Sequence, residues 1–146
     1  MPVRAAAIGE RPGRAARRLA MLALFEGEFG PARTIAALDR IAEERAVTVA
    51  VHEQAGEIVR GVVERRDELD REIGRLAPAI PVAELGRIER TILRSAIWEV
   101  LYSAATPSGE AIYDAVSLAR IYAGDAARRL VNGVLGSVSR SSGGGA

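Results

Sequence analysis

The chain contains no cysteine, which excludes disulfide bonds, thiolate metal sites and cysteine nucleophiles together. Lysine is absent as well: all 20 basic residues are arginine, so a Gly-Lys phosphate loop cannot be built. The single histidine, His52, would leave a zinc site to carboxylates alone, which is unusual. For His52 we therefore favour a surface or boundary position over a metal-binding role.

Aromatic residues make up only 4% of the chain, against 49% hydrophobic residues, so the core is built from Ala, Leu, Ile and Val. No apolar run approaches the roughly 20 residues of a membrane span, and the first residues lack the apolar segment of a secretory signal. We expect a cytoplasmic protein with one domain, because 146 residues are enough for a single sizeable core.

Catalytic motifs are also missing. The sequence has no G-x-S-x-G motif and no evident nucleophile with a base. The acidic residues between 64 and 72 alternate with arginines, which a solvated helix face explains. We interpret the chain as a binding protein that needs neither metal nor cofactor, rather than as an enzyme.

Charge is distributed unevenly along the chain. Residues 1–18 hold five arginines and one acid, a net charge of +4, and residues 120–146 hold four arginines and one acid, a net charge of +3. The middle, residues 19–119, holds eleven arginines and seventeen acids, a net charge of −6. Basic ends indicate a nucleic-acid partner, and the acidic middle suits a basic protein.

The segment 87–102, RIERTILRSAIWEVLY, predicts the central helix of the fold. It has two adjacent apolar rows at helical spacing, wider than a single seam, and such a helix expects neighbours on two sides. The first row is Ile88, Ile92 and Ala96, and the second is Leu93, Ile97 and Leu101. We expect some of its five charged residues to be paired within the core.

The rest of the chain also reads as helical. We predict a first helix over about 14–28, a second starting at Pro31 with Ile35, Ala36, Leu38 and Ile41 as its apolar residues, and a long helix from Thr48 that breaks near Asp67. Two further helices follow the loop after Tyr102, the last starting at Asp125. Alternating valines at 47–51 could start a strand, but the longer helical period outweighs them. Residues 131–134 resemble a hairpin turn, but the capped helix start at Asp125 and the following Leu135 and Val138 favour a helix.

These patterns predict an all-α bundle of about seven helices in a single domain. We expect a flexible basic arm over 1–13, a helical domain over 14–139 and a flexible tail over 140–146.

Three segments together resemble the NusB family of bacterial transcription antitermination factors. They are the arginine-rich start RAARRLAMLALF at 14–25, the central helix at 87–102, and the block from Pro107 through Ile112-x-Asp114-Ala115-Val116-x-Leu118-Ala119-Arg120 to LVNGVL at 130–135. The resemblance covers roughly 14–138 in the family's order. It implies two packed helical subdomains, no catalytic activity, and binding of boxA-type RNA from ribosomal RNA leaders together with NusE, a small-subunit ribosomal protein. It also implies an indirect link to the RNA polymerase antitermination complex.

The resemblance, carried onto this sequence, implies two sets of contact residues. The predicted RNA-binding residues lie at the starts of the first and last helices, where we expect one basic face: Arg14, Arg17, Arg18, Asp125, Arg128, Arg129 and Asn132. The predicted NusE-binding residues lie at the start of the central helix: Glu84, Glu89 and Arg90.

A second hypothesis remains open at the sequence level. An all-α protein–protein interaction module, or a homo-oligomer such as a homodimer, would show the same patterns if its basic ends were incidental. Binding of RNA distinguishes the two.

Overall fold

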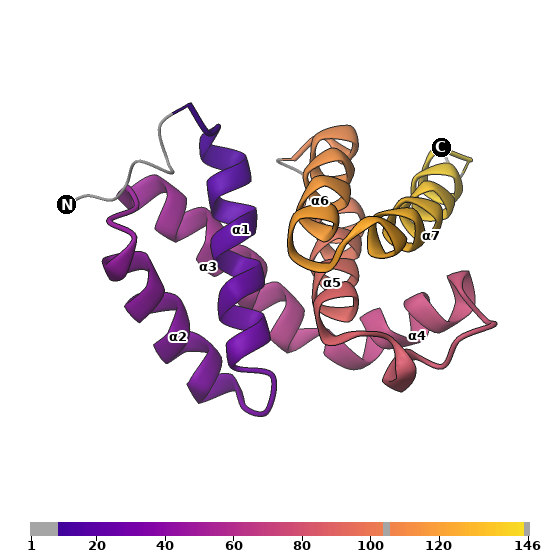
Figure 1. The fold of residues 1–146 in the computed structure, drawn as a ribbon, viewed down its shortest axis with the longest axis horizontal. Helices are drawn as coiled ribbons and strands as arrows, with labels where there is room; N and C mark the ends of the chain where they lie inside the picture. Colours follow the sequence, from indigo (N-terminus) through magenta and orange to yellow (C-terminus); the bar gives the residue numbers. More distant parts are fainter. Residues whose placement is uncertain (1–8, 104–105, 145–146) are drawn as a thin grey trace. The chain divides into compact units, whose positions relative to one another are not determined.

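The structure, a computed structural model, describes residues 9–103 and 106–144. The chain divides into two compact units, Met1–Val63 and Glu64–Ala146, called here the N-terminal and C-terminal units. Within the described ranges, all regular structure is helical, with seven α-helices and one short 3-10 helix (Figure 1). The predicted all-α class is confirmed. No described helix combines the length and apolar character needed to cross a membrane.

The N-terminal unit contains α1 (Pro12–Glu26), α2 (Pro31–Glu44) and nearly all of α3 (Val49–Glu64). Both α1 and α2 carry a proline in the first turn, where the missing N–H would have no helical partner. The two helices pack against each other across a short connection (Figure 1). Helix α1 therefore begins two residues before the predicted start at Arg14.

The buried faces of α1 and α2 follow the helical period. Most of the apolar run at 19–25 is buried. In α2 the buried face is Thr34, Ala37, Leu38, Ile41 and Ala42. Ala36 is exposed because it lies on the opposite side of the helix from Leu38, and Ile35, at the edge of the buried face, is 39% exposed. The apolar face predicted for this helix was therefore wrong in part.

The connection between α1 and α2 is held by one side chain. The Thr34 hydroxyl donates toward the carbonyl oxygens of Gly27, at 2.8 Å, and of Gly30, at 3.0 Å. A Cβ atom added at Gly27 would lie 2.4 Å from the Thr34 Cα atom, so only glycine fits there without a shift of the backbone. This close approach sets the angle at which α2 leaves α1.

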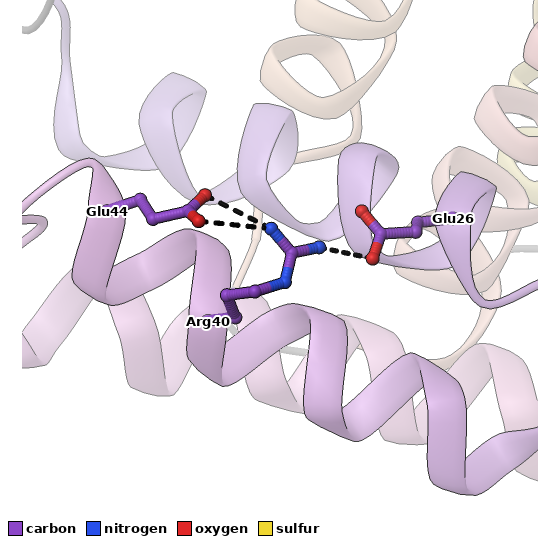
Figure 2. A network of polar contacts seen from close by, with 3 residues as sticks. All are labelled: Glu26, Arg40 and Glu44. Atoms are coloured by element: carbon purple, nitrogen blue, oxygen red, sulfur yellow. Dashed lines mark hydrogen bonds and ion pairs between the residues drawn. The ribbon is translucent and has the colours of Figure 1, made fainter.

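The same two helices are also joined on their surface. Arg40 of α2 lies between Glu26 of α1 and Glu44 one turn further along α2 (Figure 2). Its Nη1 atom is 3.1 Å from Glu44 Oε1. These hydrogen bonds raise the pKa of the Arg40 guanidinium, and the bond to Glu26 has the largest effect. His52 of α3 pairs with Asp39 of α2 at 2.9 Å, in agreement with the boundary position favoured for His52.

The C-terminal unit is organised around α5 (Arg87–Tyr102), as the sequence predicted. Helix α5 packs against α4 (Arg66–Leu76), α6 (Ser108–Ala123) and α7 (Asp125–Gly144). The short 3-10 helix η2 (Val82–Glu84) precedes it and contacts α4. Four residues of the double row are almost fully buried: Ile92, Leu93, Ala96 and Ile97. Leu101, predicted in the second row, is 41% exposed, because it lies in the last turn, beyond the packed part of the helix.

Two polar connections join α5 to α4. Arg94, buried in the middle of α5, donates from Nε and Nη2 to the two carboxylate oxygens of Asp70 at 2.7 and 2.9 Å. At the end of α5 the Tyr102 hydroxyl donates to Glu68 at 3.1 Å, and the Arg65 guanidinium lies 4.1 Å from the Tyr102 ring centroid. The expected pairing of charged residues on the central helix is confirmed for Arg94.

The helix boundaries differ from the predictions in small ways. The long helical segment breaks at Arg65, two residues before Asp67. Gly124, with φ of 95°, separates α6 from α7 in a conformation that favours glycine. Residues 131–134 are helical, which rejects the hairpin. Helix α7 continues to Gly144, so most of the segment expected to be a tail is helical; no proline stops the helix there.

Candidate nucleic-acid interface

Arg14 and Arg18, at the start of α1, are brought together by an acidic residue outside the predicted set of contact residues. Arg14 Nε lies 3.3 Å from Glu10 Oε2, and Arg18 Nη2 donates to the same oxygen at 2.8 Å. The side chains of the two arginines are 18% and 20% exposed. The spacing of four residues between successive members was the available signal, since it brings side chains together on a helix, although Glu10 itself lies just before the N-cap residue Arg11.

Arg17 occupies a different environment from its neighbours. It is 6% exposed, and it shares its side of α1 with the buried residues Ala20 and Met21. A buried guanidinium retains its charge but offers little surface to a phosphate. The role of Arg17 in RNA binding stays a prediction, and its burial ranks it below Arg14 and Arg18.

The start of α7 repeats the same arrangement in the C-terminal unit. The Asp125 carboxylate accepts a hydrogen bond from Arg128 Nε at 2.7 Å and a second from Arg129. The Arg129 side chain is 64% exposed and that of Arg128 is 36% exposed. Asn132 follows on the exposed side of the helix. These four residues form an accessible surface of hydrogen-bonding groups at one helix end.

Electrostatics hold Asp125 in its ionised form. The hydrogen bond from Arg128, supported by the positive charges of Arg128, Arg129 and Arg120, lowers the pKa of the Asp125 carboxyl. The same bond raises the pKa of the Arg128 guanidinium. A carboxylate in the first turn also complements the positive end of the helix. The Asp125 carboxylate therefore holds both arginines at the helix start.

The residues predicted to bind a partner protein lie where η2 passes into α5. Glu84 is exposed at the end of η2. Arg90 donates from Nη1 to the Leu85 carbonyl oxygen at 2.9 Å, which fixes the connection. Glu89 folds back over Gly86, since a Cβ atom added to that glycine would lie 2.4 Å from Glu89 Oε1. Glu89 and Arg90 thus shape the start of α5, and the Glu84 carboxylate is exposed to solvent.

The structure brings each predicted arginine pair together within its own unit. Arg14 and Arg18 meet at Glu10, and Arg128 and Arg129 meet at Asp125. The two clusters belong to different units, and the single basic face drawn from the sequence stays a prediction. Within residues 9–103 and 106–144, no group of three histidine, cysteine or acidic side chains is placed to hold a metal ion.

The fold and these clusters define a class: an all-α protein of two helical units with arginines gathered at the starts of its first and last helices. The chain belongs to the NusB family, whose family model matches residues 14–140.

Individual proteins agree with this assignment. The chain is 35% identical over 128 residues to the transcription antitermination protein NusB of Dehalococcoides mccartyi, covering 88% of this chain and 90% of that protein. It is 35% identical over 127 residues to the transcription antitermination protein NusB of Heliobacterium modesticaldum, covering 87% of this chain but only 62% of that protein. It also resembles a protein in the crystal structure of antitermination factors NusB and NusE in complex with dsRNA, with a TM-score of 0.81 and 26% identity over 90% of this chain and 98% of that one.

Proposed function

We propose that this chain is a transcription antitermination factor that binds boxA-type RNA of ribosomal RNA operon leaders together with NusE, and that it promotes transcription and maturation of ribosomal RNA. The observation that carries the proposal is the close structural likeness to a protein crystallised as antitermination factors NusB and NusE with dsRNA. The family membership over residues 14–140 supports the same function.

The arginine clusters supply the chemistry for RNA. Guanidinium groups pair with phosphate oxygens through two parallel hydrogen bonds and stack on unpaired bases. The cluster at the start of α7 is the more accessible, since the Arg129 side chain is 64% exposed. We assign RNA contacts to Arg14 and Arg18 on α1, and to Arg128, Arg129 and Asn132 on α7, with Asp125 orienting the last two arginines.

The acidic middle of the chain supplies the chemistry for NusE. Residues 19–119 carry a net charge of −6, from eleven arginines and seventeen acids, which complements a basic ribosomal protein. The proposed contact surface contains Glu84, Glu89 and Arg90. Charge complementarity of this kind speeds association and fixes orientation more than it adds affinity.

The proposed role involves no catalytic step and no cofactor, because RNA and protein recognition need only surfaces of suitable charge and shape. Its site of action is the bacterial cytoplasm, where RNA polymerase elongates ribosomal RNA. The chain reaches RNA polymerase indirectly, through the complex that it forms with NusE and nascent RNA.

An electrophoretic shift assay tests the proposal directly. Wild-type protein is titrated against a single-stranded boxA-type RNA, a duplex of the same sequence and a scrambled strand, each with and without NusE. We expect the boxA-type RNA to bind most tightly, and more tightly when NusE is present. If no RNA shifts at any protein concentration while light scattering reports a stable homodimer, the interaction-module hypothesis replaces this one.

A further inference from the structure

Glu10 holds two of the proposed RNA-binding arginines through a single oxygen atom. Its Oε2 lies 3.3 Å from Arg14 Nε and 2.8 Å from Arg18 Nη2. A guanidinium makes the same kind of charge-assisted hydrogen bond to a phosphate oxygen. The carboxylate therefore occupies the place where an RNA phosphate would sit on these arginines.

The cluster is enclosed as well as paired. The Glu10 side chain is 13% exposed, so water competes weakly for its carboxylate. The Arg40 cluster differs in both composition and exposure. One arginine lies there between two acids (Figure 2), and the side chains are about half exposed.

We propose that Glu10 is a specificity-determining residue for RNA binding: it acts as an internal phosphate mimic that an RNA phosphate must displace from Arg14 and Arg18. The inference rests on the proposed function and extends it to a residue outside the proposed contact set. Exchange of one anion for another returns little free energy for a lone phosphate, since the arginines lose one partner as they gain the next. A strand whose sequence gives it further contacts with the protein and with NusE can complete the exchange. Glu10 thus suppresses binding to arbitrary RNA.

A purely structural role for Glu10 makes a different prediction. A carboxylate near the first turn of α1 also interacts favourably with the positive, N-terminal end of that helix dipole. If Glu10 served only to orient the arginines and anchor the helix, its removal would disorder both and weaken RNA binding. The direction of the change in affinity therefore separates the two roles.

Three variants measured in full-length protein with NusE test the inference. Glu10→Gln keeps the size and hydrogen-bonding capacity of the side chain but removes its charge. Glu10→Asp retains the charge. Glu44→Gln is the matched control, because it removes the same charge from another acid–arginine pair with four-residue spacing in the same unit. Each is titrated with boxA-type and scrambled single-stranded RNA over a salt series, and its thermal midpoint is recorded.

For Glu10→Gln we expect about threefold tighter binding of scrambled RNA, within the range that one partly exposed ion pair produces. The slope of log affinity against log salt should steepen by about 0.7 for each additional phosphate engaged. The preference for boxA-type over scrambled RNA should fall. Glu10→Asp should behave like wild type, and Glu44→Gln should leave the preference unchanged.

Weaker or unchanged binding of scrambled RNA by folded Glu10→Gln would overturn the inference, as would an equal gain in Glu44→Gln. In either case wild-type binding to boxA-type RNA would leave the proposed function intact. Failure of the wild-type protein to bind any RNA would instead reject the proposed function, and the inference with it.

Discussion

Arg94 and Asp70 form a two-point salt bridge between α5 and α4, with N–O distances of 2.7 and 2.9 Å. The two ends of this bridge lie in different environments: the side chain of Arg94 is 8% exposed, whereas that of Asp70 is 29% exposed. Removing Asp70 leaves a buried guanidinium without its carboxylate. Removing Arg94 leaves a carboxylate that water already reaches.

The first prediction follows from this asymmetry. Asp70→Asn should lower the free energy of unfolding by about 2 kcal/mol, less than for a fully buried pair because Asp70 is partly hydrated. Arg94→Met keeps an apolar side chain in the same space and should cost about 1 kcal/mol or less. Urea denaturation of both variants measures the difference. A larger loss in Arg94→Met than in Asp70→Asn would contradict this account of the bridge.

The second prediction concerns the core of the C-terminal unit. Ile97 is fully buried in α5, whereas Ile121 of α6 is 48% exposed. Ile97→Ala should destabilise the protein by about 3 kcal/mol, through lost burial and the cavity left behind. Ile121→Ala, the same chemical change, should stay within about 0.5 kcal/mol of wild type. Equal effects in urea denaturation would show that α5 is not the central helix.

The third prediction concerns the connection between α1 and α2. Gly27→Ala should cost about 1–3 kcal/mol, because the new methyl group would meet the Thr34 backbone and force the two helices apart. Gly30→Ala is the control: its φ of 179° is ordinary extended backbone, and nothing lies within 4 Å of the added Cβ atom. Thermal midpoints of the two variants report the difference. An equally stable Gly27→Ala protein would argue against the close approach.

The fourth prediction concerns the ionisation of Asp125. Its pKa is lowered in the folded protein, chiefly by the hydrogen bond from Arg128. The stabilisation from this interaction is therefore complete above the unfolded-state pKa of about 3.9, and is lost as the pH falls through the folded-state pKa. We expect an NMR titration of the Asp125 carboxyl to show a midpoint below the ordinary range. Arg128→Ala should move that midpoint upward further than Arg120→Ala does, and the reverse order would contradict the assignment.

Much of the helical architecture could be predicted because it depends on spacing within one segment. The two apolar rows placed Ile92, Leu93, Ala96 and Ile97 in the core without knowledge of their neighbours. The exposure of Leu101 could not be read in the same way, since it depends on where the neighbouring helices end.

The candidate site could be predicted only in part. The distribution of net charge predicted that arginines gather at the two ends of the chain. It did not predict the burial of Arg17, because a charged residue near a helix start is usually exposed. The pairing of Arg94 with Asp70 depends on tertiary packing of two helices and left no local signal. The pairing of Glu10 with Arg14 and Arg18 did leave one, in the four-residue spacing.

The central claim is that arginines at both helix starts bind RNA, and one comparison tests it most directly. RNA affinity is measured with NusE over a salt series for wild type, for Arg18→Ala with Arg129→Ala, and for Arg33→Ala with Arg71→Ala, which removes two exposed arginines outside the proposed site. Each phosphate contact on a single strand contributes about −0.7 to the slope of log affinity against log salt. We predict that the first double variant binds more weakly with a slope shallower by on the order of one unit, while the second keeps the wild-type slope. Equal slopes and affinities in the two double variants would contradict the claim.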